Sequence, residues 1–227
     1  METVAIIVAA GQGNRAGGVI PKQYVKSKNT RMLTLTIKAF LKSDQIGAII
    51  VVINRLDELF YSKSIEAIND SRLLKPCFGG AERSDSVKNG LDIFEARAPK
   101  NVLIHDAARP FVSEGLINKI IKELKTHKAV LPVLSIVDAI WEIRDKKATF
   151  PQLTPGPDRT NLLLAQTPQG FDFKTILSAY NNFNSSAFDD ITVAYKAGVK
   201  IKTIIGDNRN KKVTSVEDLN DFKGIKK

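Results

Sequence analysis

The sequence predicts an α/β fold, in which a mostly parallel, twisted sheet carries helices on both faces and a β-hairpin arm projects from it. Short apolar runs bounded by turn residues recur along the chain, and segments with apolar residues at helical spacing lie between them. Such alternation is typical of parallel sheets that are buried on both faces. One region of period-two patterning around a polar turn predicts the arm.

The predicted elements follow in order along the chain. Apolar runs predict buried strands within residues 4–10, 48–53, 102–104, 129–134 and 199–205. Apolar residues at helical spacing predict helices within residues 33–41, 59–68, 87–94 and 116–124. With 227 residues and 43% hydrophobic content, the chain can bury a full core, and we expect a single domain over 1–227. In such sheets ligands bind beyond the carboxyl ends of the strands.

The region from about 138 to 161 breaks this alternation. Apolar residues at 139–143 and 148–150 flank a charged turn, and a proline-rich stretch follows at 151–157. This pattern predicts a β-hairpin. Because a lone two-stranded ribbon is at best marginally stable in water, a projecting arm would pack on a second copy of the chain and place Trp141 at a homodimer contact. A hairpin folded onto its own domain is the alternative.

Composition narrows the setting of the protein. No apolar run approaches the roughly 18 to 20 residues of a membrane span, and the first residues lack a signal-peptide pattern. The single cysteine, Cys77, excludes an internal disulfide, and two histidines leave too few ligands for a His-rich or Cys-rich metal site. We therefore expect a soluble, unprocessed, cytoplasmic protein that does not bind a membrane.

The net charge of +10 indicates either an anionic partner or a lysine-rich composition spread over solvated faces. The lysine clusters at 211–212 and 226–227 lack the interleaved aromatic residues that stack exposed bases. We therefore expect no nucleic acid as partner. A compact polyphosphate needs only a few converging cations.

The start of the chain concentrates positive charge behind a glycine turn. Between Glu2 and Asp44 there is no acidic residue, and the apolar run 4–10 leads directly into Gly11 and Gly13. The cations of this segment are Arg15, Lys22, Lys26, Lys28, Arg31, Lys38 and Lys42. A buried strand followed by a glycine turn and cations can present backbone N–H groups and positive charge to a phosphate. A nucleotide is the first ligand that this pattern indicates.

A dinucleotide cofactor is the alternative reading of the same loop. Gly11 and Gly13 followed by Ala16 satisfy the dinucleotide-binding spacing, but NAD requires an acidic residue about 20 positions further on, and none precedes Asp44. NADP, which prefers an arginine there, is less disfavoured. Neither cofactor calls for Arg15 within the loop or for the Pro-Lys-Gln run at 21–23, whereas a triphosphate does.

Several motifs together resemble one enzyme family. They lie at residues 9–15, 21–24, 79–87, 105–110, 158–159, 166–170, 189–190 and 212–214. In this order they are similar to sugar-phosphate nucleotidyltransferases, and more narrowly to the 2-C-methyl-D-erythritol 4-phosphate cytidylyltransferases of non-mevalonate isoprenoid biosynthesis. The resemblance implies a Rossmann-like fold. It also implies transfer of a cytidylyl group from CTP to methylerythritol phosphate, which gives 4-diphosphocytidyl-2-C-methyl-D-erythritol and pyrophosphate.

The resemblance also assigns site residues. It implies catalytic roles for Arg15, Lys22, Arg159 and Lys212, of which the first two stabilise the transition state. It implies nucleotide binding by Ala9, Ala10, Gly11, Gly13, Gly80, Ser86 and Asp106. It implies binding of the sugar phosphate by Asp106, Arg109, Arg159, Thr167 and Lys212. The remaining five cations of the opening segment are expected to be background charge.

Asp106 is the predicted metal ligand. It follows the run 101–105, which contains the predicted strand, and a carboxylate at a strand's carboxyl end can bind Mg²⁺ that bridges nucleotide phosphates. On sequence alone, an aspartate there is as often a turn or helix cap. We expect His105 to pack or hydrogen-bond rather than transfer protons, Arg83 to brace its loop, and Ser84 or Asp85 to cap the next helix.

Two departures from the family pattern bear on the acceptor. Ala139 stands where the family has a threonine that helps bind the substrate phosphate, and Phe188 and Ile191 replace small and hydroxyl residues. A ribitol-5-phosphate cytidylyltransferase is therefore an alternative, although Ala107, Ala108 and the run 166–171 favour the methylerythritol enzyme. A non-catalytic basic protein that binds nucleic acid is a more distant alternative. We expect no cyclase domain in this sequence.

Overall fold

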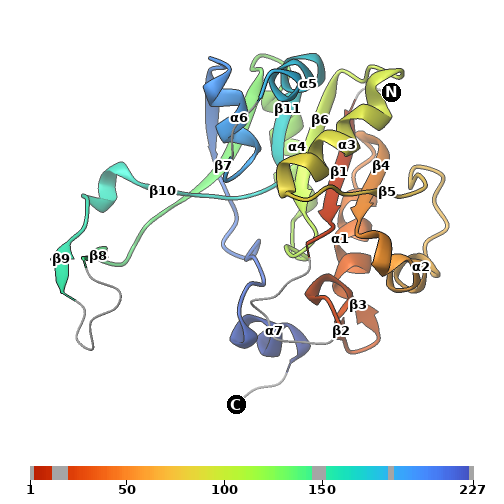
Figure 1. The fold of residues 1–227 in the computed structure, drawn as a ribbon, viewed down its shortest axis with the longest axis horizontal. Coiled ribbons are helices and arrows are strands. Elements are labelled where there is room, and N and C mark those ends of the chain that lie inside the picture. The colour runs from red at the N-terminus through yellow and green to blue at the C-terminus, as the bar shows by residue number, and fades with distance from the viewer. Residues whose placement is uncertain (1–2, 12–19, 145–151, 184–186, 225–227) are drawn as a thin grey trace.

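The structure is a computed structural model that describes residues 3–11, 20–144, 152–183 and 187–224. Its main sheet has eight strands in the order β10-β7-β11-β6-β1-β4-β5, with β12 paired to β7 (Figure 1). The strands are β1 (Thr3–Ala9), β4 (Ile46–Ile53), β5 (Cys77–Phe78), β6 (Asn101–Asp106), β7 (Ala129–Ser135), β10 (Leu163–Ala165), β11 (Gln169–Asp172) and β12 (Ile201–Ile205). The pairs β5–β4–β1–β6 and β7–β12 are parallel, and β10 and β11 run antiparallel to their neighbours. The predicted α/β class and all five predicted strands are confirmed.

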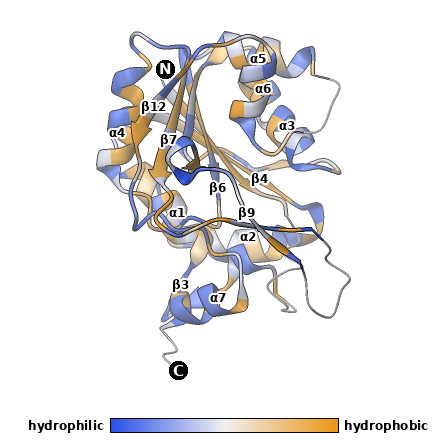
Figure 2. Cartoon of the chain, turned by 90° about the vertical axis from the view of Figure 1, so that its left-hand side faces the viewer, coloured by the Kyte–Doolittle hydropathy of each residue, from blue (hydrophilic) through white to orange (hydrophobic). Residues whose placement is uncertain are grey.

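Helices cover both faces of this sheet. The predicted helices are confirmed as α1 (Met32–Leu41), α2 (Glu58–Ile65), α3 (Arg83–Glu95) and α4 (Glu114–Glu123), and α5 (Phe173–Asn181), α6 (Asp190–Lys196) and α7 (Val216–Lys223) follow. Figure 2 shows apolar strands between α4 on one side and α3, α5 and α6 on the other. Because side chains alternate along a strand, Ala5 and Ile7 pack with α1, α2 and α4, whereas Val4 and Ile6 pack with α3, α5 and α6.

The strand β11 separates β6 from β7 and was not predicted. It is only four residues long and contains Gly170, so its sequence lacks an apolar run. A Cβ at Gly170 would lie 2.4 Å from Cγ2 of Ile120 on α4, so the helix packs directly on the strand backbone. The order of the strands in the sheet therefore depends on a tertiary contact that the local sequence pattern does not predict.

The arm region forms a two-stranded sheet of its own. Strand β8 (Trp141–Ile143) pairs antiparallel with β9 (Leu153–Pro155), and Figure 1 draws this pair at the far left, away from the main sheet. The second strand falls in the stretch expected to be a proline-rich connection, with Pro155 at its end, where a missing N–H is tolerated. The predicted second strand, 148–150, lies outside the described residues.

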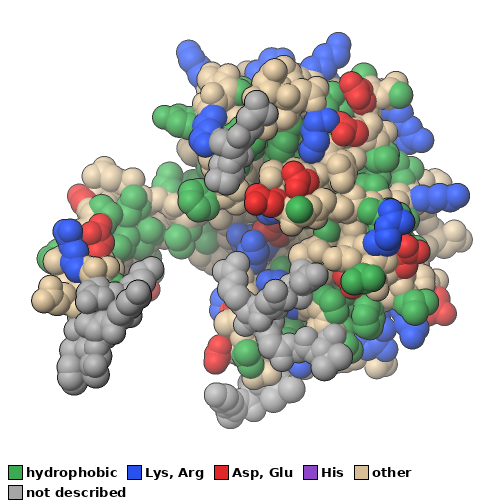
Figure 3. All heavy atoms as spheres, in the orientation of Figure 1, with side chains coloured by type: hydrophobic (Ala, Val, Ile, Leu, Met, Phe, Trp, Pro, Cys, Tyr) green, Lys and Arg blue, Asp and Glu red, His purple; other side chains and the backbone are tan. Residues whose placement is uncertain are grey.

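Two further features concern the charged side chains of the surface and the length of the helices. Figure 3 shows Lys and Arg side chains scattered over the visible face, with Asp and Glu among them. Within the described ranges, no helix is long and apolar enough to cross a membrane.

Candidate active site

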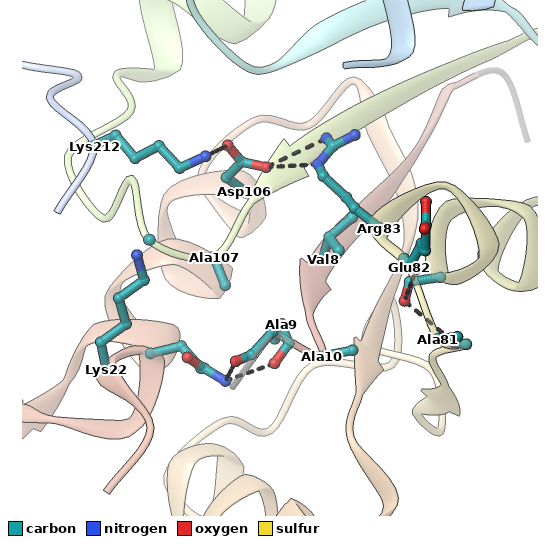
Figure 4. A pocket seen from close by; sticks show the side chains of 15 residues that line it. Val8, Ala9, Ala10, Lys22, Ala81, Glu82, Arg83, Asp106, Ala107 and Lys212 are labelled. Carbon is teal, nitrogen blue, oxygen red and sulfur yellow. Dashed lines mark hydrogen bonds and ion pairs between the residues drawn. The ribbon is translucent and has the colours of Figure 1, made fainter. Parts of the chain in front are cut away.

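A pocket of about 430 Å³ lies beyond the carboxyl ends of β1 and β6, where ligands bind in sheets of this kind (Figure 4). Eight of the predicted site residues line it: Ala9, Ala10, Gly11, Lys22, Gly80, Ser86, Asp106 and Lys212. Arg109, Arg159 and Thr167 do not line it. Gly13 and Arg15 lie outside the described residues. None of the five cations expected to be background charge lines this pocket.

Asp106 is the central charge of the pocket. Its Oδ2 lies 2.7 Å from Nζ of Lys212, and its Oδ1 accepts from Nε and Nη2 of Arg83, both at 3.3 Å (Figure 4). Burial alone would raise the pKa of this carboxyl, but the charges of Arg83 and Lys212 outweigh burial and hold the pKa well below its usual range. Asp106 is therefore an anion at neutral pH, placed between two cations.

Arg83 connects the pocket to the helical layer behind it. Its Nη1 and Nη2 donate to the two oxygens of Asp190 at 2.9 and 2.7 Å, and Tyr180 donates its hydroxyl to Oδ1 of Asp190 at 2.6 Å. Burial lowers the pKa of Arg83, but Asp190 and Asp106 outweigh burial and raise it well above its ordinary value. Arg83 thus joins Asp106 to Asp190. It is also the first residue of α3, next to the loop that it was expected to brace.

The helix cap beside this pocket differs from the expectation. Glu82 is the N-cap of α3, and Asp85 is the third helical residue, whose Oδ2 accepts from the backbone N–H of Glu82 at 3.0 Å. The prediction of Ser84 or Asp85 as the N-cap is therefore wrong. The reciprocal pair satisfies two backbone donors at once, which a single cap does not.

Two loops meet tightly at the nucleotide end of the pocket. The backbone N–H of Gly80 donates to Oγ of Ser86 at 3.2 Å, and this hydroxyl in turn donates to the carbonyl of Glu82 at 3.1 Å. A Cβ at Gly79 would lie 2.5 Å from both Cβ of Ala10 and Oγ of Ser86. Only glycine therefore allows the loop after β5 to approach the end of β1.

Gln23 fixes the start of the glycine loop. Its buried amide donates from Nε2 to the carbonyl of Ala9 at 2.7 Å and to that of Gly11 at 2.9 Å. Its neighbour Lys22, on the 3₁₀ helix η2 (Lys22–Tyr24), donates to the carbonyl of Val213 at 2.9 Å. The Pro-Lys-Gln run is visible in the sequence through its charge, but nothing in the pattern indicates this role of the glutamine.

Thr167 and His105 lie behind Asp106 and hold its backbone. The N–H of Asp106 donates to Oγ1 of Thr167 at 3.1 Å, and Oγ1 lies 3.0 Å from Nδ1 of His105. Nε2 of His105 lies 3.1 Å from the carbonyl of Arg109. Since a carbonyl only accepts, Nε2 carries the proton and Nδ1 accepts from the hydroxyl. The expected packing and hydrogen-bonding role of His105 is confirmed.

This arrangement makes a prediction about acid stability. Burial lowers the pKa of His105 to about 4, whereas an unfolded histidine titrates near 6.5. The unfolded chain therefore binds an extra proton as the pH falls from about 6.5 to 4, and folding loses about 3 kcal/mol of stability over that window. Denaturant unfolding at several pH values should show this loss, and His105→Gln should flatten the slope. If the free energy of unfolding fell equally with pH in both proteins, His105 would not be the group responsible.

Arg109 and Arg159 do not line the pocket, although the charge of Arg109 acts on Asp106. Arg109 donates to the carbonyl of Asn210 at 2.8 Å, and burial lowers its pKa. Arg159 is exposed on η4 (Arg159–Asn161) and donates to the carbonyl of Val137. The roles that the family resemblance assigns to Arg109 and Arg159 stay predictions.

The predicted metal ligand is compatible with Mg²⁺ in one specific way. Among the described residues, no group of three or more His, Cys, Asp or Glu side chains could hold a metal by itself. Mg²⁺ in nucleotide sites is usually held by one or two carboxylates together with substrate phosphates and water. Asp106 supplies one ionised carboxylate to the pocket, so the residues fit a metal brought in with a nucleotide.

Fold and site together define an α/β protein with a charged pocket at the carboxyl ends of its parallel strands. Comparison with known proteins makes this specific: the family described as 2-C-methyl-D-erythritol 4-phosphate cytidylyltransferase, IspD, matches residues 3–225. The chain belongs to this family.

Individual relatives agree with that membership. The chain is 39% identical over 219 residues to the bifunctional enzyme IspD/IspF of Paramagnetospirillum magneticum, covering 96% of this chain and 55% of that protein. It is 38% identical to the 2-C-methyl-D-erythritol 4-phosphate cytidylyltransferase of Roseobacter denitrificans, covering 96% and 94%. The structure of 4-diphosphocytidyl-2C-methyl-D-erythritol synthase from Anaerococcus prevotii superposes with a TM-score of 0.82 at 28% identity, covering 98% and 97%. The chain thus spans about half the length of bifunctional relatives and nearly all of single-function ones.

Proposed function

We propose that the protein transfers the cytidylyl group of CTP to 2-C-methyl-D-erythritol 4-phosphate and releases pyrophosphate. The observation that carries this proposal is the family match over residues 3–225. Relatives that the chain covers to 94% of their own length have this activity in their names. The pocket at the carboxyl ends of the strands supports it, because it gathers eight residues that the family resemblance assigns to the site.

The proposed reaction needs charge stabilisation more than proton transfer. A phosphate oxygen of the acceptor is already an anion, and it attacks the α-phosphorus of CTP in line while the bond to pyrophosphate breaks. Lys22 and Lys212 line the pocket as cations, so they suit stabilisation of the charge that develops there. A unit charge pair at 4 Å is worth roughly 4 kcal/mol at an effective dielectric near 20. The role of Arg15 is proposed from the resemblance alone.

The backbone around the pocket suits recognition of the nucleotide. The ends of β1 and of the loop after β5 are held within van der Waals contact by Gly79, so backbone groups of Ala10 and Gly80 face the same space. We propose that cytosine binds there, beside Ser86. Mg²⁺, which we propose as cofactor, would be held by Asp106 and the phosphates and would neutralise charge on the departing pyrophosphate.

A homodimer through the arm is part of the proposal. Three apolar side chains of the arm strands are about half exposed, Trp141, Ile143 and Leu153, and Figure 3 shows hydrophobic side chains gathered on the arm. Leu163 and Leu164 of the adjoining strand β10 are equally exposed. Large exposed apolar patches mark interaction sites. The arm pair β8–β9 has no third strand among the described residues, so a second copy is the occupant we propose. We also propose a cytoplasmic location, in line with the single free Cys77.

The arm proposal predicts a change in mass on substitution. Trp141→Glu places a charge among these apolar side chains, and sedimentation at micromolar concentration should shift from dimer to monomer. Leu59→Glu changes an apolar residue of α2 that is more exposed than Trp141, and it should leave the dimer intact. A wild-type protein that sediments as a monomer would contradict the arm proposal.

A pyrophosphate assay tests the function. CTP, ATP, UTP and GTP are each paired with methylerythritol 4-phosphate and with ribitol 5-phosphate in the presence of Mg²⁺. The proposal expects release only with CTP and methylerythritol phosphate. Because Ala139 departs from the family pattern, the assay with ribitol 5-phosphate is essential. Turnover with ribitol 5-phosphate alone would overturn the choice of acceptor. Salt-sensitive binding to polynucleotides without turnover would favour a non-catalytic basic protein.

A further inference from the structure

Asp190 lies behind the pocket and is joined to it by a single side chain. It is fully buried and does not line the pocket, so it cannot contact a nucleotide bound there. Its carboxylate accepts both Nη groups of Arg83, at 2.9 and 2.7 Å, and the hydroxyl of Tyr180 at 2.6 Å. A bidentate pair of this kind fixes the plane of the guanidinium group.

The place of Asp190 is fixed by the sheet. Asp190 is the first residue of α6, whose N-cap Asp189 accepts from the N–H of Thr192 at 3.0 Å. Gln169 of β11 donates to Asp189 at 2.9 Å and accepts from the N–H of Ile191 at 2.9 Å. The start of α6 is therefore tied to a strand of the central sheet on both sides of Asp190.

Arg83 transmits this position to the pocket. Its Nε and Nη2 reach Oδ1 of Asp106 at 3.3 Å, longer than its contacts to Asp190, and Lys212 takes Oδ2 of Asp106 at 2.7 Å (Figure 4). The charges thus alternate from Asp190 through Arg83 and Asp106 to Lys212. Because Asp190 accepts from both Nη groups of Arg83 and offsets its positive charge, the carboxylate of Asp106 stays oriented toward Lys212.

Loss of the Asp190 charge would disturb this order. Arg83, whose side chain is only 28% exposed, would then keep Asp106 as its acidic partner, and a partly buried charge that loses a partner is unfavourable. The guanidinium would turn toward Asp106 and draw that carboxylate away from Lys212. A change behind the pocket would in this way reach the group that faces the substrates.

We propose that Asp190 is a positioning residue of the transfer reaction: it orients Arg83 and, through Arg83, the carboxylate of Asp106 that pairs with Lys212. This inference rests on the proposed function, and it adds a residue to which neither the family resemblance nor the comparisons assign a role. Tyr180 supports it by donating to the same carboxylate oxygen as Nη1 of Arg83.

A double-mutant cycle tests this proposal. Asp190→Asn keeps the shape and removes the charge, and kcat should fall about 10- to 100-fold, as for loss of a partner that orients a site residue. In an Asp106→Asn background the same substitution should change kcat less than about 3-fold, because the group it positions has lost its charge. Fully additive effects would overturn the proposal. Asp70→Asn, in another bidentate pair with Arg72 at 2.8 and 3.0 Å, is the matched control and should leave kcat within about 2-fold.

Two further measurements keep the proposal testable. If Asp190→Asn does not fold, Tyr180→Phe removes only the hydroxyl donor and should give the same non-additivity with a smaller effect, about 3- to 10-fold. A crystal structure of whichever variant folds should show the Asp106 carboxylate moved relative to Lys212, and unchanged positions of Arg83 and Asp106 would overturn positioning. If the wild-type protein releases no pyrophosphate, the proposed function fails. The crystal structure of the variant would still decide whether Asp190 positions Arg83 and Asp106.

Discussion

Replacing Lys22 with alanine lowers kcat by about 10²- to 10³-fold and leaves the KM for CTP nearly unchanged, in line with the loss of one transition-state donor. Lys22 lies on η2 at the edge of the pocket, next to Gln23, which holds the glycine loop. Its charge therefore faces the space where the phosphates are proposed to bind. Steady-state pyrophosphate release over a range of CTP concentrations separates kcat from KM.

The control for this prediction is Lys38→Ala. Lys38 lies on α1 within the same acid-free opening of the chain but lines a different pocket, so its loss should leave kcat within about 2-fold if the effect of Lys22 is local. A change in Lys22→Ala that is confined to KM would show that Lys22 only binds CTP.

Replacing Asp106 with asparagine lowers kcat/KM by at least about 10²- to 10³-fold, because the pocket loses its central anion while the shape is retained. Lys212 and Arg83 would then face a neutral amide. Because their side chains are 40% and 28% exposed, stability should fall by less than the roughly 3–5 kcal/mol that is lost on breaking a fully buried pair. Kinetics and denaturant unfolding on the same variant are needed, since they separate the loss of rate from the loss of folded protein.

Asp92→Asn is the matched control for this second prediction. Asp92 pairs with Lys88 on the exposed face of α3 and does not line the pocket, so both activity and stability should stay close to those of the wild type. Retention of most activity by a folded Asp106→Asn protein would contradict the central place of this carboxylate.

The sequence predicted the parts of the fold that local patterns control. Buried parallel strands are continuous apolar runs, so β1, β4, β6, β7 and β12 could be found, and Asp106 could be placed at a strand end. The meeting of the start of the glycine loop with Gly80 and Ser86 was expected from the family resemblance, not from a local pattern. The association of Lys212 with Asp106 came from the family resemblance, because no spacing links the two.

The parts that could not be predicted depend on tertiary contacts. The pair Asp189–Asp190 was visible as a motif, but its partners Arg83 and Tyr180 come from other helices, and no pattern along the chain joins them. Ile191, which departs from the family pattern, lies on α6 and packs in the hydrophobic core, which explains an apolar residue at that position. The other departure there, Phe188, is fully exposed and has no structural explanation.

A crystal structure with CTP and Mg²⁺ tests the central claim most directly. We expect cytosine beside Gly80 and Ser86, and the triphosphate between Lys22 and Asp106, in the pocket beyond β1 and β6. CTP bound instead in the separate basic pocket lined by Lys26, Lys38 and Lys63 would contradict the account.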